Sequence, residues 1–196
     1  MQLLGKPTQD RPLLVLAVAE EAQFLDTSLP VLLTGVGKVN AANALAGILG
    51  RWPNLARIVN LGTAGALQPG MSGIRVVDTV IQHDFDTDLL RKLTGSTFGE
   101  PIALAGGGTT LASGDSFIAD GAARMRLADQ AQLVDMEGYA LAVAASTAGV
   151  PIDIVKYVSD DADEHALKSW RESVAIAARS LADWAAHNVI GYGGTA

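Results

Sequence analysis

The sequence VDMEGYA at residues 134–140, taken together with IVKYVSDDAD at residues 154–163, decides the fold class. Each stretch begins as a short apolar strand and becomes acidic where the next helix is expected to begin. Open α/β sheets bind their ligands at such strand ends, so the two stretches predict carboxylates gathered at one site. Taken singly, Glu137 and Asp163 are more simply explained as acids in first helical turns, where the helix dipole stabilises them. Their occurrence at two chain turns favours a ligand site.

The rest of the chain alternates short apolar runs with helical patterns, as expected for an α/β domain. Glu20 and Glu21 follow the first apolar run and begin a helix, and Trp170 and Trp184 are expected to anchor the last, amphipathic helix. The expected strands cover residues 12–19, 30–34, 57–61, 74–83, 109–112, 131–135 and 151–158. The longer helices are expected at residues 41–49, 137–148 and 164–187.

Three connecting segments contain residues typical of turns. Residues 62–66 (GTAGA) predict a turn of small residues, where the backbone can approach a ligand closely. Residues 113–118 (SGDSFI) are expected to lead into a helix through residues that suit an N-cap. Phe117 in this segment is either a core aromatic or a flat face for a planar base. Residues 89–101 lack periodicity and predict a loop or lid.

Composition and charge restrict the class of protein. The 196 residues fit one domain, expected to span residues 1–196, and are 49% apolar and 18% charged, as in a globular chain. The net charge of −7 and the lack of any Lys/Arg cluster argue against a nucleic-acid or anionic-membrane surface, so a small-molecule partner is expected. There is no cysteine, and the three histidines are far apart, so neither thiol chemistry nor a metal or cofactor is expected.

The beginning of the chain has no targeting pattern. No basic region leads into a long apolar stretch with a cleavage site, and the apolar run at residues 13–18 is too short to span a bilayer. We therefore expect a cytoplasmic protein. The glycine turn at residues 35–37 lacks both the dinucleotide-binding fingerprint and the spacing of a P-loop, so neither motif applies.

Six segments in a fixed order resemble the purine nucleoside phosphorylase/nucleosidase superfamily, most nearly the bacterial 5′-methylthioadenosine/S-adenosylhomocysteine nucleosidases. They are EE at 20–21, TGVGKVNAA at 34–42, NLGTAGAL at 60–67, SGDSFI at 113–118, VDMEGYA at 134–140 and VSDDAD at 158–163. The resemblance implies a three-layer α/β/α domain around a twisted, mixed, partly barrel-like sheet. That fold agrees with the alternation of strands and helices.

The resemblance also implies roles for residues that match the family's motifs. The water-activating acid falls on Glu21 and the purine-protonating acid on Asp160. The ribose-binding pair falls on Met136 and Glu137.

The purine-binding positions of the family fall on three further segments. Phe117 and Ile118 match residues that line and hydrogen-bond the purine. Thr63 stands where the nucleosidases often have Ser near the water and ribose. Ala64 and Gly65 match small residues of the base pocket, and Ser159 matches the Ser that precedes the catalytic Asp.

The chain departs from the family pattern at three places. Only residues 26–29 separate the first helix from the second strand, where the nucleosidases usually insert a hairpin. Lys156 replaces a usual Arg, whose planar fork a Lys cannot supply. Gly138 and Tyr139 replace a pair of small residues. The group carried on the ribose 5′ carbon is therefore left open.

The expected activity is hydrolysis of the N-glycosidic bond of a purine nucleoside, with adenine as leaving base. Phosphorolysis is disfavoured because Glu20, Glu21 and Asn60 occupy positions where phosphorylases carry phosphate-binding groups. A futalosine-type or other purine nucleoside hydrolase remains an alternative, as does a non-catalytic nucleoside-binding protein. The resemblance further implies a homodimer in which residues 84–101 reach towards the ligand of the partner.

Overall fold

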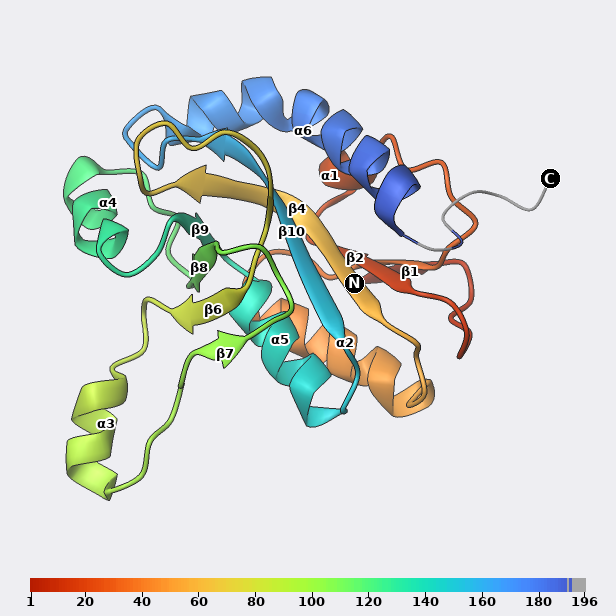
Figure 1. Cartoon of the computed structure of the whole chain (residues 1–196), viewed down its shortest axis with the longest axis horizontal. Helices are drawn as coiled ribbons and strands as arrows, with labels where there is room; N and C mark the ends of the chain where they lie inside the picture. Colours follow the sequence, from red (N-terminus) through yellow and green to blue (C-terminus); the bar gives the residue numbers. More distant parts are fainter. Residues whose placement is uncertain (190, 192–196) are drawn as a thin grey trace.

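The computed structural model describes residues 1–189 and 191, in which ten strands form one mixed sheet with helices on both faces (Figure 1). The strands are β1 Gln2–Leu4, β2 Leu13–Leu16, β3 Val31–Leu33, β4 Ile58–Ala66, β5 Gly73–Val76, β6 Thr79–Gln82, β7 Ile102–Ala103, β8 Thr110–Ser113, β9 Leu133–Asp135 and β10 Ile152–Asp160. The helices are α1 Ala19–Ala22, α2 Lys38–Arg51, α3 Thr87–Thr94, α4 Gly121–Ala128, α5 Gly138–Thr147 and α6 Ala166–Asn188.

Strand β4 is the branch point of the sheet. It pairs in parallel with β2 and β10, and its last residues pair antiparallel with β9. The main path runs β1-β3-β2-β4-β9-β8-β6-β7, while β10 lies between β4 and β5. The sheet does not close into a barrel. The expected layered α/β architecture is confirmed.

The two faces of the sheet bury separate apolar clusters. Helices α2 and α5 cover one face with small residues such as Ala44 and Ala145, while α6 and α1 cover the other. All four residues of β2 are buried, as expected for a strand covered on both faces. The abundant alanines let these helices approach the sheet closely, and strand ends from β4, β9 and β10 meet at one edge of the core.

Two predicted segments form strands that the local sequence does not reveal. Residues 62–66, predicted as a turn, continue β4, because β9 and β10 supply hydrogen-bonding partners to this small-residue stretch. Residues 74–83, predicted as one strand, are the two strands β5 and β6, which pair with different neighbours. Both predictions were wrong for the same reason, since strand pairing is decided by distant segments.

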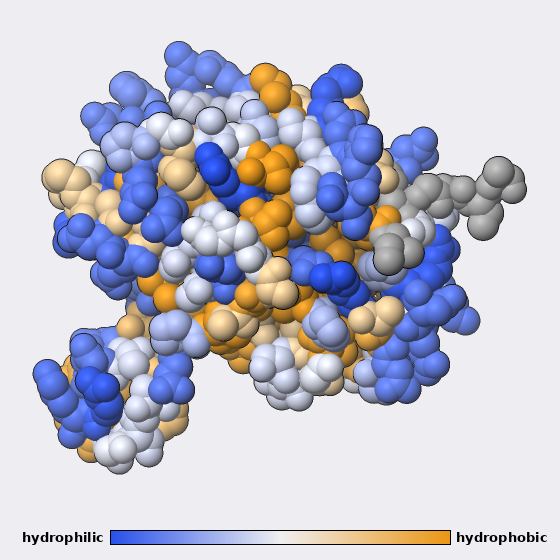
Figure 2. All heavy atoms as spheres, viewed as in Figure 1, coloured by the Kyte–Doolittle hydropathy of each residue, from blue (hydrophilic) through white to orange (hydrophobic). Residues whose placement is uncertain are grey.

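The prediction of a loop at residues 89–101 was also wrong for residues 89–94, which belong to helix α3. Asp86 caps this helix by accepting a hydrogen bond from Leu89 N, and Gly95 ends it in the left-handed conformation. None of its residues is buried, and the helix stands apart from the main body (Figures 1 and 2). The helix after residues 113–118 begins later than predicted, at Gly121, because Asp120 is its N-cap.

Across the described part of the chain, no helix combines the length and the apolar character needed to cross a membrane.

Candidate active site

A cavity of about 250 Å³ lies where the ends of β4, β9 and β10 meet the beginnings of α1, α5 and α6. The structure places around it every residue to which the family resemblance assigns a site role: Glu21, Thr63, Ala64, Gly65, Phe117, Ile118, Met136, Glu137, Ser159 and Asp160. Further lining residues have no site role assigned from the sequence: Ala17, Val18, Val36, Ser116, Val134, Asp135, Leu167 and Trp170.

Glu21 is buried, and backbone and side-chain donors fix its carboxylate. Its Oε1 accepts hydrogen bonds from Thr63 N at 2.7 Å and from Thr63 Oγ1 at 2.9 Å. Its Oε2 accepts one from Ala17 N at 3.3 Å. Trp170, expected only as a helix anchor, donates its indole N–H to Thr63 Oγ1 at 2.9 Å. Because an indole nitrogen can only donate, Thr63 keeps its own proton for Glu21.

Glu137 is buried at the start of α5, but its side chain does not cap that helix. Its Oε1 accepts a hydrogen bond at 2.8 Å from the N–H of Gly37, the glycine in the turn before α2. Burial, followed by the charge of Asp135, raises the pKa of Glu137 to about 7, although Lys156 and the Gly37 N–H oppose the change. The first-turn explanation therefore does not describe Glu137. It does not describe Asp163 either, which lies before the N-cap of α6 and accepts a hydrogen bond from His165 N.

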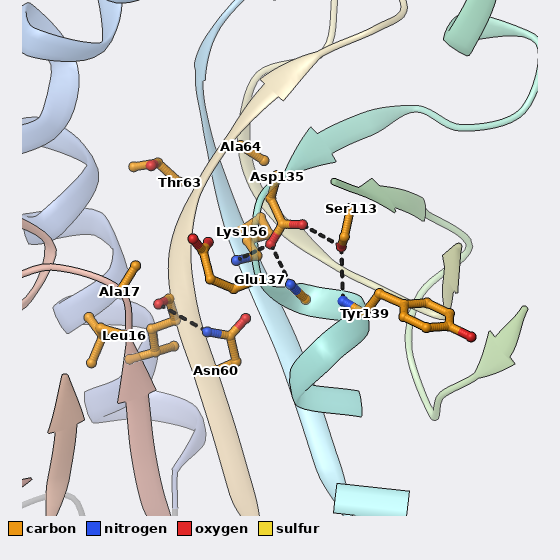
Figure 3. Close-up of polar contacts among 12 residues, drawn as sticks. Leu16, Ala17, Asn60, Thr63, Ala64, Ser113, Asp135, Glu137, Tyr139 and Lys156 are labelled. Carbon is orange, nitrogen blue, oxygen red and sulfur yellow. Dashed lines mark hydrogen bonds and ion pairs between the residues drawn. The ribbon is translucent and has the colours of Figure 1, made fainter. Parts of the chain in front are cut away.

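Asp135 forms the centre of a polar network beside Glu137 (Figure 3). It accepts hydrogen bonds from Ser113 Oγ at 2.5 Å and from Gly138 N at 2.9 Å, and Lys156 Nζ lies 2.9 Å from its Oδ2. Ser113 Oγ in turn accepts from Tyr139 N at 2.9 Å. Sequence reasoning assigned this network no role. A lysine in the middle of residues 154–158 (IVKYV), which are otherwise free of charge, was the signal for a buried counter-charge.

Asp160 ends β10 directly after a break in the strand register. Its Oδ2 lies 2.8 Å from Ser159 Oγ, and its Oδ1 accepts from Ala162 N at 2.9 Å. Burial raises the pKa of Asp160, with contributions from the charges of Asp161 and Asp163, while the hydrogen bonds from Ser159 and Ala162 oppose this. Asp160 does not cap α6, whose N-cap is His165.

The wall beside Asp160 suits a flat ligand. A Cβ added to Gly65 would lie 2.9 Å from Asp160 Oδ1, so only glycine allows the carboxylate to approach the strand so closely. Phe117 is 48% exposed, so this aromatic residue is not part of the core. Its ring and the side chain of Ile118 line the cavity instead. Among the residues described, no group of His, Asp and Glu side chains is arranged to hold a metal ion.

Comparisons with known proteins agree with this geometry. The family model of the phosphorylase superfamily matches residues 26–188. A 5′-methylthioadenosine/S-adenosylhomocysteine nucleosidase of Actinobacillus succinogenes is 32% identical over 191 residues, covering 83% of this chain and 81% of that protein. One from Marinomonas sp. is 26% identical over 183 residues, covering 81% and 79%.

Solved structures share the fold. A Helicobacter pylori nucleosidase mutant with 5′-methylthioadenosine in its active site superposes with a TM-score of 0.79 at 19% identity, covering 90% of this chain and 96% of that one. A futalosine hydrolase of the same species reaches 0.77 at 19% identity, covering 89% and 95%. With the family model matching most of its length and nucleosidases among its relatives, the chain belongs to the phosphorylase superfamily.

Proposed function

We propose that the protein hydrolyses the N-glycosidic bond of an adenine nucleoside such as 5′-methylthioadenosine or S-adenosylhomocysteine, releasing adenine and the ribose derivative. The observation that carries this proposal is the convergence of three carboxylates, Glu21, Glu137 and Asp160, on one cavity from three separate elements. Related proteins that are 5′-methylthioadenosine/S-adenosylhomocysteine nucleosidases support the substrate class.

Asp160 acts as the general acid. Cleavage of the bond between C1′ and N9 leaves charge on the purine, and a proton delivered to N7 makes the base a neutral leaving group. Acid catalysis of this kind gives roughly 10²–10⁴-fold. The raised pKa of Asp160 favours the protonated form that this role requires. Ser159 Oγ donates to Asp160 Oδ2 and Ala162 N donates to Oδ1, and these two hydrogen bonds hold the carboxyl group in place at the cavity.

Glu21 acts as the base that takes a proton from water. The water attacks the anomeric carbon as the sugar gains oxocarbenium character, as in glycoside hydrolysis. Both donors from Thr63 go to Oε1, so Oε2, with its single long hydrogen bond from Ala17 N, is the oxygen available to the water.

Glu137 accepts hydrogen bonds from the 2′- and 3′-hydroxyls of ribose. The Gly37 N–H holds only Oε1, and the carboxylate faces the cavity from the start of α5. An ionised carboxylate is an acceptor only, which matches two hydroxyl donors and favours ribose over deoxyribose.

The charge around the cavity favours water over phosphate as the nucleophile. In the described residues, no Lys or Arg lines the cavity, and the nearby Lys156 is already paired with Asp135. Asn60, which stands at a phosphorylase phosphate position, lies outside the lining and donates to Val15 O of β2. A phosphate dianion would therefore meet carboxylates without a compensating cation.

A product assay tests the proposal. The protein is incubated with methylthioadenosine, S-adenosylhomocysteine, adenosine, inosine and futalosine, each with and without phosphate, and the products are identified. We expect free adenine and free sugar from an adenine nucleoside, with no stimulation by phosphate. A sugar 1-phosphate as main product would indicate phosphorolysis, cleavage of futalosine alone would indicate the alternative hydrolase, and no product would indicate a binding protein.

We also propose a homodimer in which residues 84–101 of one subunit reach the cavity of the other. Helix α3 has no buried residue, yet Leu89, Leu93 and Phe98 expose 49%, 71% and 48% of their surface on this projecting segment. Such apolar side chains are expected to be covered by another surface.

Sedimentation at assay concentration tests the dimer. We expect the wild type to sediment as a dimer and Leu93→Glu to sediment as a monomer with reduced activity. Met125→Glu, at a 70% exposed position on α4, is the matched control and should leave the dimer intact. A fully active wild-type monomer would contradict the proposal.

A further inference from the structure

Lys156 has the largest fully buried side chain among the described residues, with 2% of its surface exposed. Its ammonium lies 2.9 Å from Asp135 Oδ2, and none of the catalytic steps above uses it. Burying an ammonium ion costs several kcal/mol unless nearby charges and hydrogen bonds compensate. The position of this cation therefore requires an explanation.

Asp135 has hydrogen-bond donors besides Lys156. Its Oδ1 accepts from Ser113 Oγ and its Oδ2 accepts from Gly138 N, so each oxygen has a neutral donor of its own. The ion pair lies beside the cavity, because Asp135 is one of its lining residues (Figure 3). The role of Lys156 therefore depends on the other groups that lie near its ammonium.

Gly62 in β4 shows which group shares the space around the ammonium. A Cβ added to this glycine would lie 3.1 Å from Lys156 Nζ and 3.4 Å from Glu21 Oε1. The cation and the carboxylate of Glu21 thus flank the same point, which is open only because the strand has no side chain there. Glycine at residue 62 permits a close approach that alanine would obstruct.

The charges around Lys156 come from three elements. Asp135 on β9, Glu137 at the start of α5 and Glu21 on α1 all act on it. Burial alone would lower the pKa of Lys156, but these three carboxylates outweigh burial and raise it, so Lys156 carries its positive charge. The cluster holds one buried cation against three buried carboxylates, of which the proposed reaction uses Glu21 and Glu137.

We propose, resting on the hydrolysis proposed above, that Lys156 is a positioning residue whose charge, anchored on Asp135, allows Glu137 to be ionised beside Glu21 and the sugar. It touches no reacting atom. It offsets the repulsion between the carboxylates while leaving the cluster net negative, which suits a sugar that becomes cationic in the transition state.

The inference predicts the direction in which the pKa of Glu137 changes in two variants. The charges of Asp135 and Glu21 raise the pKa of Glu137, whereas Lys156 and the Gly37 N–H lower it. Removing the cation must therefore move the ionisation of Glu137 to higher pH. Removing the charge of Asp135 must move it to lower pH.

The experiment compares kcat/KM against pH for the wild type and two variants acting on methylthioadenosine. Lys156→Met keeps the length of the side chain without the charge. We expect its acid limb to move up by about one pH unit, which lowers kcat/KM about tenfold at pH 6 and less at high pH. Asp135→Asn should move the acid limb down. Arg57→Met removes the ion pair with Asp153 near the opposite end of β10 and should leave the profile in place.

Binding of an adenine C-nucleoside, whose glycosidic C–C bond cannot be hydrolysed, provides a second readout by calorimetry over the same pH range. The same two opposite shifts are expected in the dissociation constant. If Lys156→Met does not fold, the shift of the acid limb in Asp135→Asn tests the inference. Acid limbs that stay in place, or move together, would overturn the inference while hydrolysis by the wild type stands. A wild type that hydrolyses no nucleoside would instead refute the proposed function.

Discussion

The indole nitrogen of Trp170 on α6 donates a hydrogen bond to Thr63 Oγ1 on β4 across 2.9 Å, and thereby directs the Thr63 proton towards Glu21. Trp170→Phe keeps an aromatic ring at the cavity but removes the donor. A neutral hydrogen bond contributes about 0.5–1.5 kcal/mol, so we expect kcat to fall about 3- to 10-fold with little change in KM.

Trp184→Phe is the matched control, because Trp184 packs against the apolar cluster beneath α6, away from the cavity. Steady-state kinetics with melting curves compare the two variants. Equal losses of kcat in both would mean that Trp170 acts only through the packing of α6.

Asp160→Asn tests the general acid. Asparagine keeps the size of the side chain but cannot deliver a proton, so turnover of an adenine nucleoside should fall by orders of magnitude while nucleoside binding survives. A p-nitrophenyl riboside, whose leaving group is already acidic, should lose much less. Rates on both substrates are measured beside a melting curve. Equal losses with a lowered melting temperature would mean that Asp160 only holds the turn at Ala162.

Glu137→Gln tests how the ionisation of the buried Glu137 affects the stability of the folded protein. Burial and Asp135 raise the pKa of Glu137 from 4.5 to about 7, so the folded state binds this proton more tightly than the unfolded chain does. The resulting stabilisation is complete below pH 4.5 and is lost as the pH rises through 7, on the order of 3 kcal/mol in the ligand-free protein.

Glutamine does not titrate and still accepts from the Gly37 N–H. Melting temperatures should therefore show the variant gaining on the wild type between pH 5 and pH 8. The variant should also lose its preference for ribonucleosides over 2′-deoxyribonucleosides. A constant difference in melting temperature across this range, or an unchanged preference, would remove Glu137 from its assigned role.

Gly65→Ala tests the close packing behind Asp160. The new methyl group would lie 2.9 Å from Asp160 Oδ1 and 3.1 Å from the Cβ of Ala162, so the carboxylate must move and activity should fall. Gly47→Ala on α2 meets nothing within 4 Å and should stabilise the protein by about 0.5–1 kcal/mol without affecting turnover. Activity assays and thermal unfolding distinguish the two. Full activity in Gly65→Ala would mean that Asp160 has room to move.

Sequence reasoning located residues at the cavity where a single chain segment carries the signal. The strand ends at residues 134–137 and 158–160 each combine an apolar run with acids, and Asp135, Glu137 and Asp160 all line the cavity. Sequence reasoning failed where the pairing partner of a segment is distant in the sequence. Residues 62–66 look like a turn in isolation, and only pairing with β9 and β10 makes them a strand.

The missed site residues share a physical reason. Val134, Leu167 and Trp170 have side chains that are equally typical of a core, so no local pattern marks them as lining a cavity. Lys156 differs, because a charge inside an apolar strand is unusual enough to be noticed. Its partner Asp135 could be identified only when the fold brought β9 and β10 to the same edge.

Residues 63–65 of β4 line one part of the cavity and carry only small side chains, and the close packing along this strand restricts how the enzyme can be altered. Added methyl groups at Gly62 and Gly65 would collide with the charged groups on either side. Directed evolution of the substrate range therefore has little freedom on this strand. Val36 and Leu167, which also line the cavity and are exposed by 46% and 54%, are better positions at which to select new specificities.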